Sequence, residues 1–155
     1  MFITKHEDMV NDTITYIEKS LQFHKKHREF ADKENLFAAY YNIGITNRFL
    51  KKYDDALESF NNALEWATQR MDYESECVTL GQIGLTNLTI KNIDRATVNF
   101  KGCFDICQKM NNNRLQLDCL LCLGYLSYTL GNDKDTKMYF EYAQKVFGPI
   151  TVIVR

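Results

Sequence analysis

Apolar residues recur along the chain at helical spacing, and short polar turns separate the helical segments. In one such segment Ala56, Phe60 and Ala63 fall on a single helical face. The chain has one proline and seven glycines, which favours long helices over many short strands. The pattern predicts three first helices and three second helices, which lie near 33–50, 73–91 and 113–130, and near 54–70, 94–110 and 133–147.

The same residue types return every 40 positions. Three columns show this most clearly: Gly44, Gly84 and Gly124; Ile43, Ile83 and Leu123; Phe60, Phe100 and Phe140. The glycines are expected to leave room for close helix contact, and the phenylalanines to fill the space between paired helices. One helix pair cannot bury its apolar face alone, so the three pairs are expected to stack.

Short polar residues stand where these helices begin. Asp32, Asp72 and Asn112 are also 40 residues apart. A short side-chain oxygen can accept hydrogen bonds from the free N–H groups of a first helical turn, so we expect these residues to be N-caps of the first helices. The acidic residues Asp54, Asp55 and Asp94 are expected to cap the second helices.

The unit resembles the tetratricopeptide repeat. Residues at that family's spacing are Tyr40, Ile43, Gly44, Ala56, Phe60 and Ala63, and the second and third units follow over residues 32–148. The resemblance implies an all-α, right-handed superhelical solenoid of about three helix pairs plus an N-terminal helix. The 40-residue period exceeds the common ~34. It is similar to the long repeats of Pins/LGN-type polarity adaptors, kinesin light chains and axonemal tetratricopeptide proteins, and it does not choose among them.

Asparagines near the recurrent glycines Gly44, Gly84 and Gly124, called here the frame glycines, add to this likeness. Asn42, Asn47 and Asn87 resemble those that flank the glycine in the polarity adaptors, whereas the third unit has Cys122 and Ser127 there.

The repeat frame divides the chain into five expected segments. They are an N-terminal amphipathic helix or degenerate repeat within 1–30, repeats at 32–71, 72–111 and 112–148, and an apolar tail at 149–155. The N-terminal helix is expected over 7–28, with Val10, Ile14, Ile17, Leu21 and His24 on one face. Gly148 and Pro149 are expected to end the last helix. The segment Ile150–Val154 is β-branched and apolar, so we expect it to pack on the last repeat or on a partner.

Charge and composition narrow the function classes. The net charge of −1 comes from 19 basic and 20 acidic residues, which argues against nucleic acid or an anionic membrane as partner. No apolar stretch is long enough to span a bilayer, and no secretory signal is evident. Five cysteines, an odd number within helical patterns, fit a reducing compartment. We therefore expect a cytoplasmic protein. Location within a cytoskeletal or ciliary assembly is an alternative that these features also allow.

Catalytic chemistry has little support. All three histidines, His6, His24 and His27, lie near the amino terminus, outside the repeats. No glycine-rich phosphate loop or paired-carboxylate motif stands apart from the turns and caps. The basic run His24–Arg28 is better explained by the favourable charge at a helix C-terminus than by an acidic ligand. We expect no enzyme activity, no catalytic residues and no cofactor.

The cysteines offer the strongest alternative chemistry. Cys103 and Cys107 lie one helical turn apart, and Cys119 and Cys122 form a Cys-x-x-Cys, so four thiolates could hold zinc. However, Cys103, Cys107 and Cys119 replace alanines of the other units, and free cysteine behaves as a small hydrophobe. We therefore expect the cysteines to be reduced, metal-free core residues. No other cysteine stands at metal-ligand spacing from Cys77 in the sequence.

Apolar residues on the first helices, away from the buried stripe, indicate a binding groove. The expected partner-binding residues on the concave side are Tyr41, Ile45, Arg48, Phe49, Leu85, Leu88, Leu121, Tyr125 and Tyr128. Such a groove suits an amphipathic helix or an extended peptide. The same residues could instead cover the N-terminal helix or the next repeat of a longer array.

Two functions follow from this lining. The first is a non-catalytic scaffold that binds a protein or peptide segment, either alone or as a member of a multi-protein complex. The second is a structural subunit of a larger cytoskeletal or axonemal assembly, with the groove buried by other chains.

Overall fold

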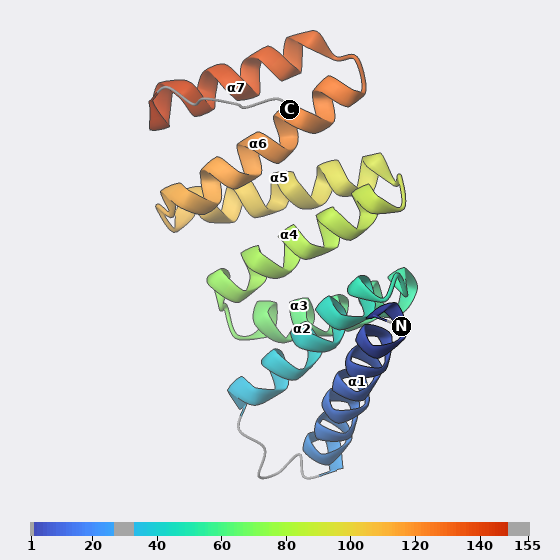
Figure 1. The fold of residues 1–155 in the computed structure, drawn as a ribbon. Coiled ribbons are helices and arrows are strands. Elements are labelled where there is room, and N and C mark those ends of the chain that lie inside the picture. Colours follow the sequence, from blue (N-terminus) through green and yellow to red (C-terminus); the bar gives the residue numbers. More distant parts are fainter. Residues whose placement is uncertain (1, 27–32, 149–155) are drawn as a thin grey trace.

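The computed structural model describes residues 2–26 and 33–148, which form seven α-helices and no strand (Figure 1). The helices are α1 (Phe2–Lys26), α2 (Lys33–Phe49), α3 (Tyr53–Gln69), α4 (Tyr73–Thr89), α5 (Ile93–Lys109), α6 (Asn113–Thr129) and α7 (Asp133–Phe147). The expected all-α solenoid is confirmed, and each helix from α2 to α7 ends within two residues of its predicted bounds. The expected N-cap Asp32 and the tail 149–155 lie outside the described residues.

The turns show why the period is 40 residues. Helices α2 to α6 each contain 17 residues, and a three-residue turn follows each of them. The middle residue of every such turn has a left-handed backbone: Lys51, Met71, Lys91, Asn111 and Gly131, with φ between 53° and 69°. The next N–H then donates back into the preceding helix, as from Asn92 to the Asn87 carbonyl at 2.8 Å. Helices of equal length joined by equal turns give every pair the same stacking geometry.

Changing a left-handed turn residue to glycine should stabilise the fold. Only Gly131 has no Cβ among the five turn residues, and a left-handed conformation costs other residues about 1–2 kcal/mol. We expect Lys91→Gly to raise the free energy of unfolding by about 0.5–1 kcal/mol in urea denaturation, after the entropy of unfolded glycine is allowed for. The mirror variant Gly131→Ala should lower it by a similar amount. Equal stabilities of both variants and the parent would contradict this account of the turns.

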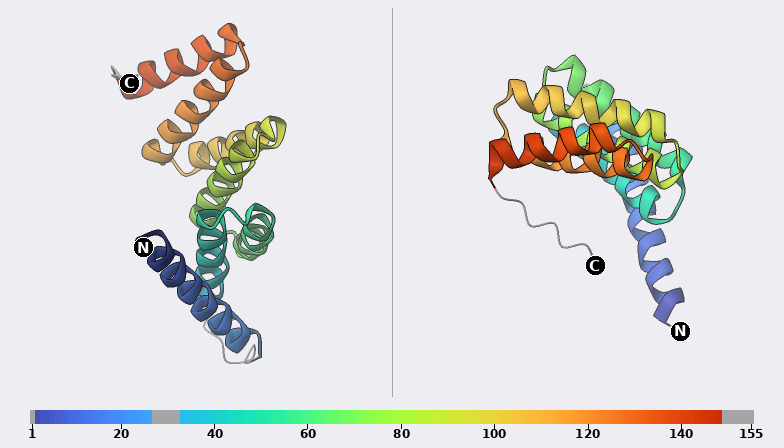
Figure 2. Two further views of the ribbon diagram at one scale, coloured as in Figure 1. Left: turned by 45° about the vertical axis from the view of Figure 1, so that its right-hand side comes forward. Right: turned by 90° about the horizontal axis from the view of Figure 1, so that it is seen from above.

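The helices stack in antiparallel pairs along one axis (Figures 1 and 2). α2 packs closely with α3, α4 with α5 and α6 with α7, while α3 contacts α4 and α5 contacts α6. Helix α1 lies against α2 at the amino-terminal end of the stack. The buried residues therefore form successive clusters along the stack instead of one central core.

The contact between glycine and phenylalanine holds each pair together. A Cβ built on Gly44 would lie 2.5 Å from the Phe60 ring, and one on Gly84 would lie 2.9 Å from Phe100. Phe60 and Phe100 are almost fully buried, as expected. Phe140 also contacts its glycine, Gly124, but is only half-buried. The expectation that Phe140 is buried as fully as Phe60 and Phe100 is therefore wrong. The reason is position, since no described helix covers α7.

The helix caps agree with the sequence in part. Asp72 accepts from the Ser75 N–H at 3.1 Å, and Asn112 accepts from the Leu115 N–H at 3.2 Å. The prediction that Asp54, Asp55 and Asp94 cap the second helices is wrong. They lie inside the first turns of α3 and α5, where a negative charge is favoured by the helix dipole.

The two ends of the stack differ from its middle. Helix α1 begins at Phe2, five residues before the expected start. On its expected apolar face Ile14 is buried while Val10 and Ile17 are half-buried, and the side chains of Leu21 and His24 lie outside the described set. At the other end Gly148 closes α7 with φ 84°, as expected. No helix in the described ranges is both long and apolar enough to cross a bilayer.

Candidate functional site: a cavity on the first-helix face

A cavity of about 210 Å³ opens on the side of the stack formed by α2, α4 and α6, called here the first-helix face. Helix α4 supplies residues from Cys77 to Leu85, and α6 supplies residues from Leu115 to Cys122. Tyr41 of α2 closes one side, and Phe100 of α5 lies at the floor. The first helices thus present a hollow in the middle of the stack.

A single glycine explains why the hollow exists. Gly81 stands 40 residues from both Tyr41 and Leu121, so the middle unit lacks the large side chain of its neighbours. A Cβ built on Gly81 would meet no atom within 4 Å. Gly81 therefore differs from the frame glycines, whose Cβ positions are blocked by phenylalanine rings.

The cavity wall is mainly apolar with a few polar groups. Its complete lining is Tyr41, Cys77, Val78, Gly81, Gln82, Leu85, Phe100, Cys103, Leu115, Asp118, Cys119 and Cys122. The buried Oε1 atom of Gln82 has no hydrogen-bond partner within the described part of the chain. Burial raises the pKa of Tyr41, although a hydrogen bond with the Gln82 side chain opposes the shift. Among the described residues of this lining Asp118 is the one that is charged, so they contribute no positive charge to the wall.

The structure gathers only some of the nine expected binding residues at this cavity. Tyr41 and Leu85 line it. Ile45 packs beside the buried cluster of Ala56, Phe60 and Ile83, and Leu88 packs beside that of Phe100. These half-buried residues thus also serve the fold.

The other five lie away from the cavity lining. Arg48 and Leu121 are half-buried, and Phe49, Tyr125 and Tyr128 are exposed. Tyr125 and Tyr128 lie on α6, the last first helix of the stack, and correspond to Leu85 and Leu88 one unit earlier. The next first helix covers Leu85 and Leu88, whereas no further first helix follows α6 in the described chain.

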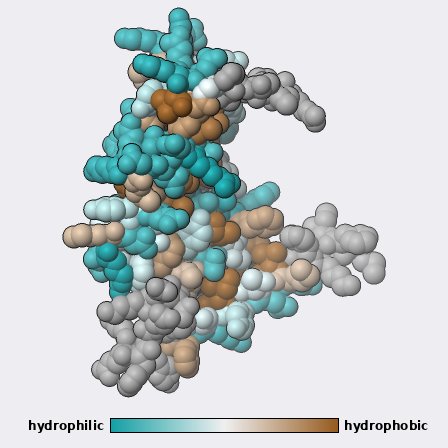
Figure 3. Space-filling view, turned by 90° about the vertical axis from the view of Figure 1, so that its left-hand side faces the viewer, coloured by the Kyte–Doolittle hydropathy of each residue, from teal (hydrophilic) through white to brown (hydrophobic). Residues whose placement is uncertain are grey.

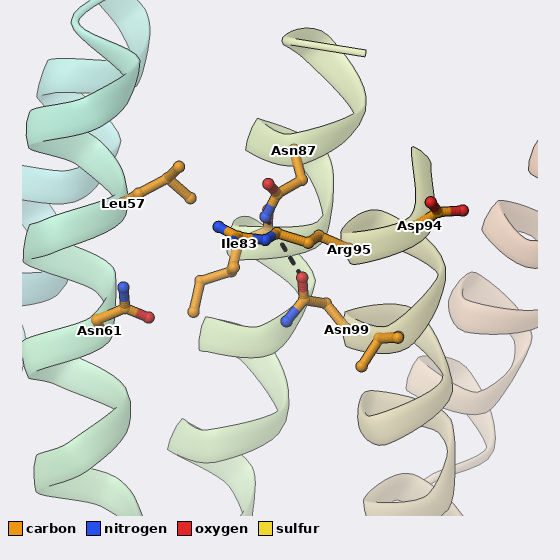
Figure 4. A pocket seen from close by; sticks show the side chains of 8 residues that line it. Leu57, Asn61, Ile83, Asn87, Asp94, Arg95 and Asn99 are labelled. Atoms are coloured by element: carbon orange, nitrogen blue, oxygen red, sulfur yellow. Dashed lines mark hydrogen bonds between the residues drawn. The ribbon is translucent and has the colours of Figure 1, made fainter. Parts of the chain in front are cut away.

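A second cleft of about 370 Å³ lies among α3, α4 and α5 (Figure 4). Polar residues dominate it, including Asn61, Asn87, Arg95 and Asn99. Asn87 donates to the Ile83 carbonyl at 3.0 Å and to Asn99 Oδ1 at 3.4 Å. The buried Oδ1 atom of Asn87 has no partner in the described chain. Sequence reasoning noted Asn87 only for its resemblance to other repeats and missed the cleft.

One face of the stack has a patchy distribution of apolar and polar residues. On the face shown in Figure 3, brown apolar patches alternate with teal polar ones along the stack. Single exposed apolar residues are normal on proteins, so only the apolar groups that line a hollow are candidates for a ligand site.

Four cysteines come together beneath the first-helix cavity. Cys77 of α4, Cys103 and Cys107 of α5 and Cys119 of α6 form one buried cluster. Burial raises the pKa of the Cys107 thiol to about 12, so this thiol is neutral at pH 7. The Cys-x-x-Cys spacing suggested Cys119 and Cys122 as joint metal ligands and offered no such neighbour for Cys77. Instead Cys77 contacts Cys103, and Cys122 lies outside the cluster.

Comparison with solved structures agrees with the observed architecture. BtubC (BKLC) from P. vanneervenii superimposes with a TM-score of 0.79 at 18% identity, and the match covers 96% of this chain and 62% of that chain. The apo form of RapI gives a TM-score of 0.77 at 15% identity, covering 94% of this chain and 52% of that chain. The chain has a tetratricopeptide-type helical-repeat fold.

These likenesses are limited to the fold. No protein-family model matches the sequence, and no curated protein sequence matches it. The chain spans 62% and 52% of the lengths of BtubC and RapI. Helical repeats of this type generally serve protein interaction through the surfaces that stacking creates.

Proposed function

We propose that this chain is a non-catalytic, cytoplasmic interaction module that binds an extended or helical peptide segment across its first-helix face. The observation that carries the proposal is the apolar cavity left open by Gly81. A volume of about 210 Å³ suits one large apolar side chain, and apolar hollows with few polar groups are typical ligand sites.

Polar groups at the cavity specify what the segment should offer. The buried Gln82 Oε1 atom has no partner in the described chain and can accept a hydrogen bond from a ligand. A peptide with an N–H or O–H donor beside the anchoring side chain is therefore favoured. Asp118 adds a negative charge, which favours a basic residue and disfavours an acidic one. Because Asp118 is the only charge in the lining, binding should depend weakly on salt.

Filling the cavity should weaken peptide binding without unfolding the chain. Peptides would first be selected from a random displayed library on the purified chain, and their affinities measured by fluorescence anisotropy. Gly81→Leu places a side chain in the hollow and is expected to weaken binding at least tenfold. Gly81→Ala is the matched control, because it adds only a Cβ that meets nothing within 4 Å.

A third variant separates the two hollows. Asn99→Ala alters the polar cleft among α3, α4 and α5 and should leave peptide affinity unchanged. If Gly81→Leu binds the selected peptides like the parent while Asn99→Ala does not, the ligand site is the polar cleft and our assignment is wrong. Leu88 is a poorer probe, since it packs against the buried cluster around Phe100.

Exposed apolar residues at the carboxyl-terminal end support the alternative of a structural subunit in a larger assembly. Leu130, Met138 and Val146 are each at least 46% exposed, on or beside α7. Terminal repeats of stable solenoids usually carry a polar outer face. A subunit of this kind should self-associate or precipitate when isolated, whereas an adaptor should sediment as a monomer across a wide concentration range.

A further inference from the structure

We propose that Cys77, Cys103, Cys107 and Cys119 form a binding site for one thiophilic d10 metal ion, Zn²⁺ or Cu⁺, between α4, α5 and α6. The expectation of metal-free cysteines concerned a different set, with Cys122 in place of Cys77. The stacking of three helices creates the new set, which joins cysteines that are up to 42 positions apart in the sequence.

The separations between the sulfur atoms bring these residues within the reach of one ion. The Sγ atom of Cys103 lies 2.7 Å from that of Cys77, 3.1 Å from that of Cys119 and 3.9 Å from that of Cys107. The Sγ atoms of Cys77, Cys103 and Cys107 all lie within 4.8 Å of one another. Tetrahedral zinc with Zn–S bonds of about 2.3 Å requires sulfurs about 3.8 Å apart. Cys77 and Cys103 must separate by about 1 Å to hold an ion, and Cys119, which lies outside that mutual group of three, must move toward the ion as the fourth ligand.

The cluster also has a route by which a cation can reach it. The first-helix cavity is lined by Cys77, Cys103 and Cys119, so it borders three of the four cysteines. Asp118 is the only charged residue of that lining, which favours entry of a cation over an anion. Soft thiolate ligands select Zn²⁺ and Cu⁺ over hard cations such as Mg²⁺ or Ca²⁺.

Charge distinguishes the two candidate ions. Zn²⁺ held by four thiolates leaves two negative charges in the core, whereas Cu⁺ held by two leaves one. None of the described residues that line the adjoining cavity is basic. Thiols that keep their protons can remain as neutral packing residues, so the fold does not depend on the metal.

The repeat itself provides substitutions that remove the site and retain the fold. Alanine occupies the equivalent positions Ala63 and Ala143 for Cys103, and Ala67 for Cys107. Cys103→Ala removes the central sulfur and should fold normally. Cys122→Ala is the matched control, because Cys122 lines the same cavity but lies outside the cluster.

The test uses the full chain, reduced and freed of metal, then loaded anaerobically with Zn²⁺ or with Cu⁺ in separate samples. We expect native mass spectrometry to show one ion per chain with at least one of them, and the melting temperature to rise by several degrees. Cys122→Ala should behave like the parent, whereas folded Cys103→Ala should retain at least tenfold less metal. The ion that is retained after gel filtration against a competing chelator identifies the occupant.

Two results would overturn the proposal. One is a parent chain that retains no more of either ion than Cys103→Ala, whether its thiols stay reduced or join in a disulfide. The other is equal loss of metal from Cys122→Ala and Cys103→Ala. Neither result bears on peptide binding, which is measured separately with the Gly81 variants.

Discussion

Replacing Phe100 with alanine is expected to lower the free energy of unfolding by roughly 3–5 kcal/mol. The Phe100 side chain is 2% exposed and packs in one cluster with Ala96, Leu123 and Leu126. It lies between the frame glycine Gly84 and the next helix pair, so its removal leaves a cavity with neighbours on both sides. Denaturation in urea, followed by circular dichroism, measures the loss.

The end of the stack provides an internal comparison. Phe140→Ala removes the same atoms from α7, where the ring is half-buried, and should cost about half as much. A loss under about 1 kcal/mol for Phe100→Ala would be too small for a core cavity and would contradict the packing described for the middle unit. Losses of equal size at both positions would mean that another chain or segment covers α7.

The helices could be predicted from sequence because the local signals agree with the global repeat. The frame glycines, the phenylalanines sixteen residues later and the polar turns all keep one period. The structure shows that the half-unit is also regular, with left-handed turn residues every 20 positions. A period of this kind fixes helix ends closely, since a shift at one turn would disturb all the others.

The cavity and the cysteine cluster depend on how antiparallel helices meet, which the repeat columns do not show. Cys77 and Cys103 stand at nearly equal distances before and after the turn at Lys91, and Gly84 and Phe100 are related in the same way. Reflecting the sequence about each turn would have brought Cys77 and Cys103 together. Cys122 lies one helical turn from Cys119 and also lines the cavity, but it packs beside the cluster around Phe100 instead of the cysteine cluster.

Exposure at the ends could not be predicted from the columns either. The repeat makes Tyr125 equivalent to Leu85 and Phe140 equivalent to Phe100. The columns describe a residue inside an endless stack, whereas α6 and α7 lack a following pair in the described chain. The same residue type is therefore core in the middle unit and surface in the last one.

Two glycines three residues apart on α4 should respond to alanine in opposite directions. At Gly84 the added Cβ would lie 2.9 Å from Cε1 of Phe100 and 3.0 Å from Cζ. The buried ring has little freedom to move, so overpacking by about 1–3 kcal/mol outweighs the gain in helix propensity of up to about 1 kcal/mol. We expect Gly84→Ala to lower the free energy of unfolding by about 1–2 kcal/mol.

At Gly81 the balance is reversed. The added Cβ meets nothing within 4 Å, so only the helix propensity changes, and Gly81→Ala should raise the free energy of unfolding by about 0.5–1 kcal/mol. Both variants share a helix, a solvent and an unfolded chain, so their difference of about 2–3 kcal/mol isolates the contact between Gly84 and Phe100. Combining Gly84→Ala with Phe100→Leu should recover part of the loss, because the smaller side chain makes room for the methyl group. If both alanine variants are stabilised equally, the frame glycines do not hold the helix pairs in close contact, and another cause must be found for the 40-residue recurrence of glycine.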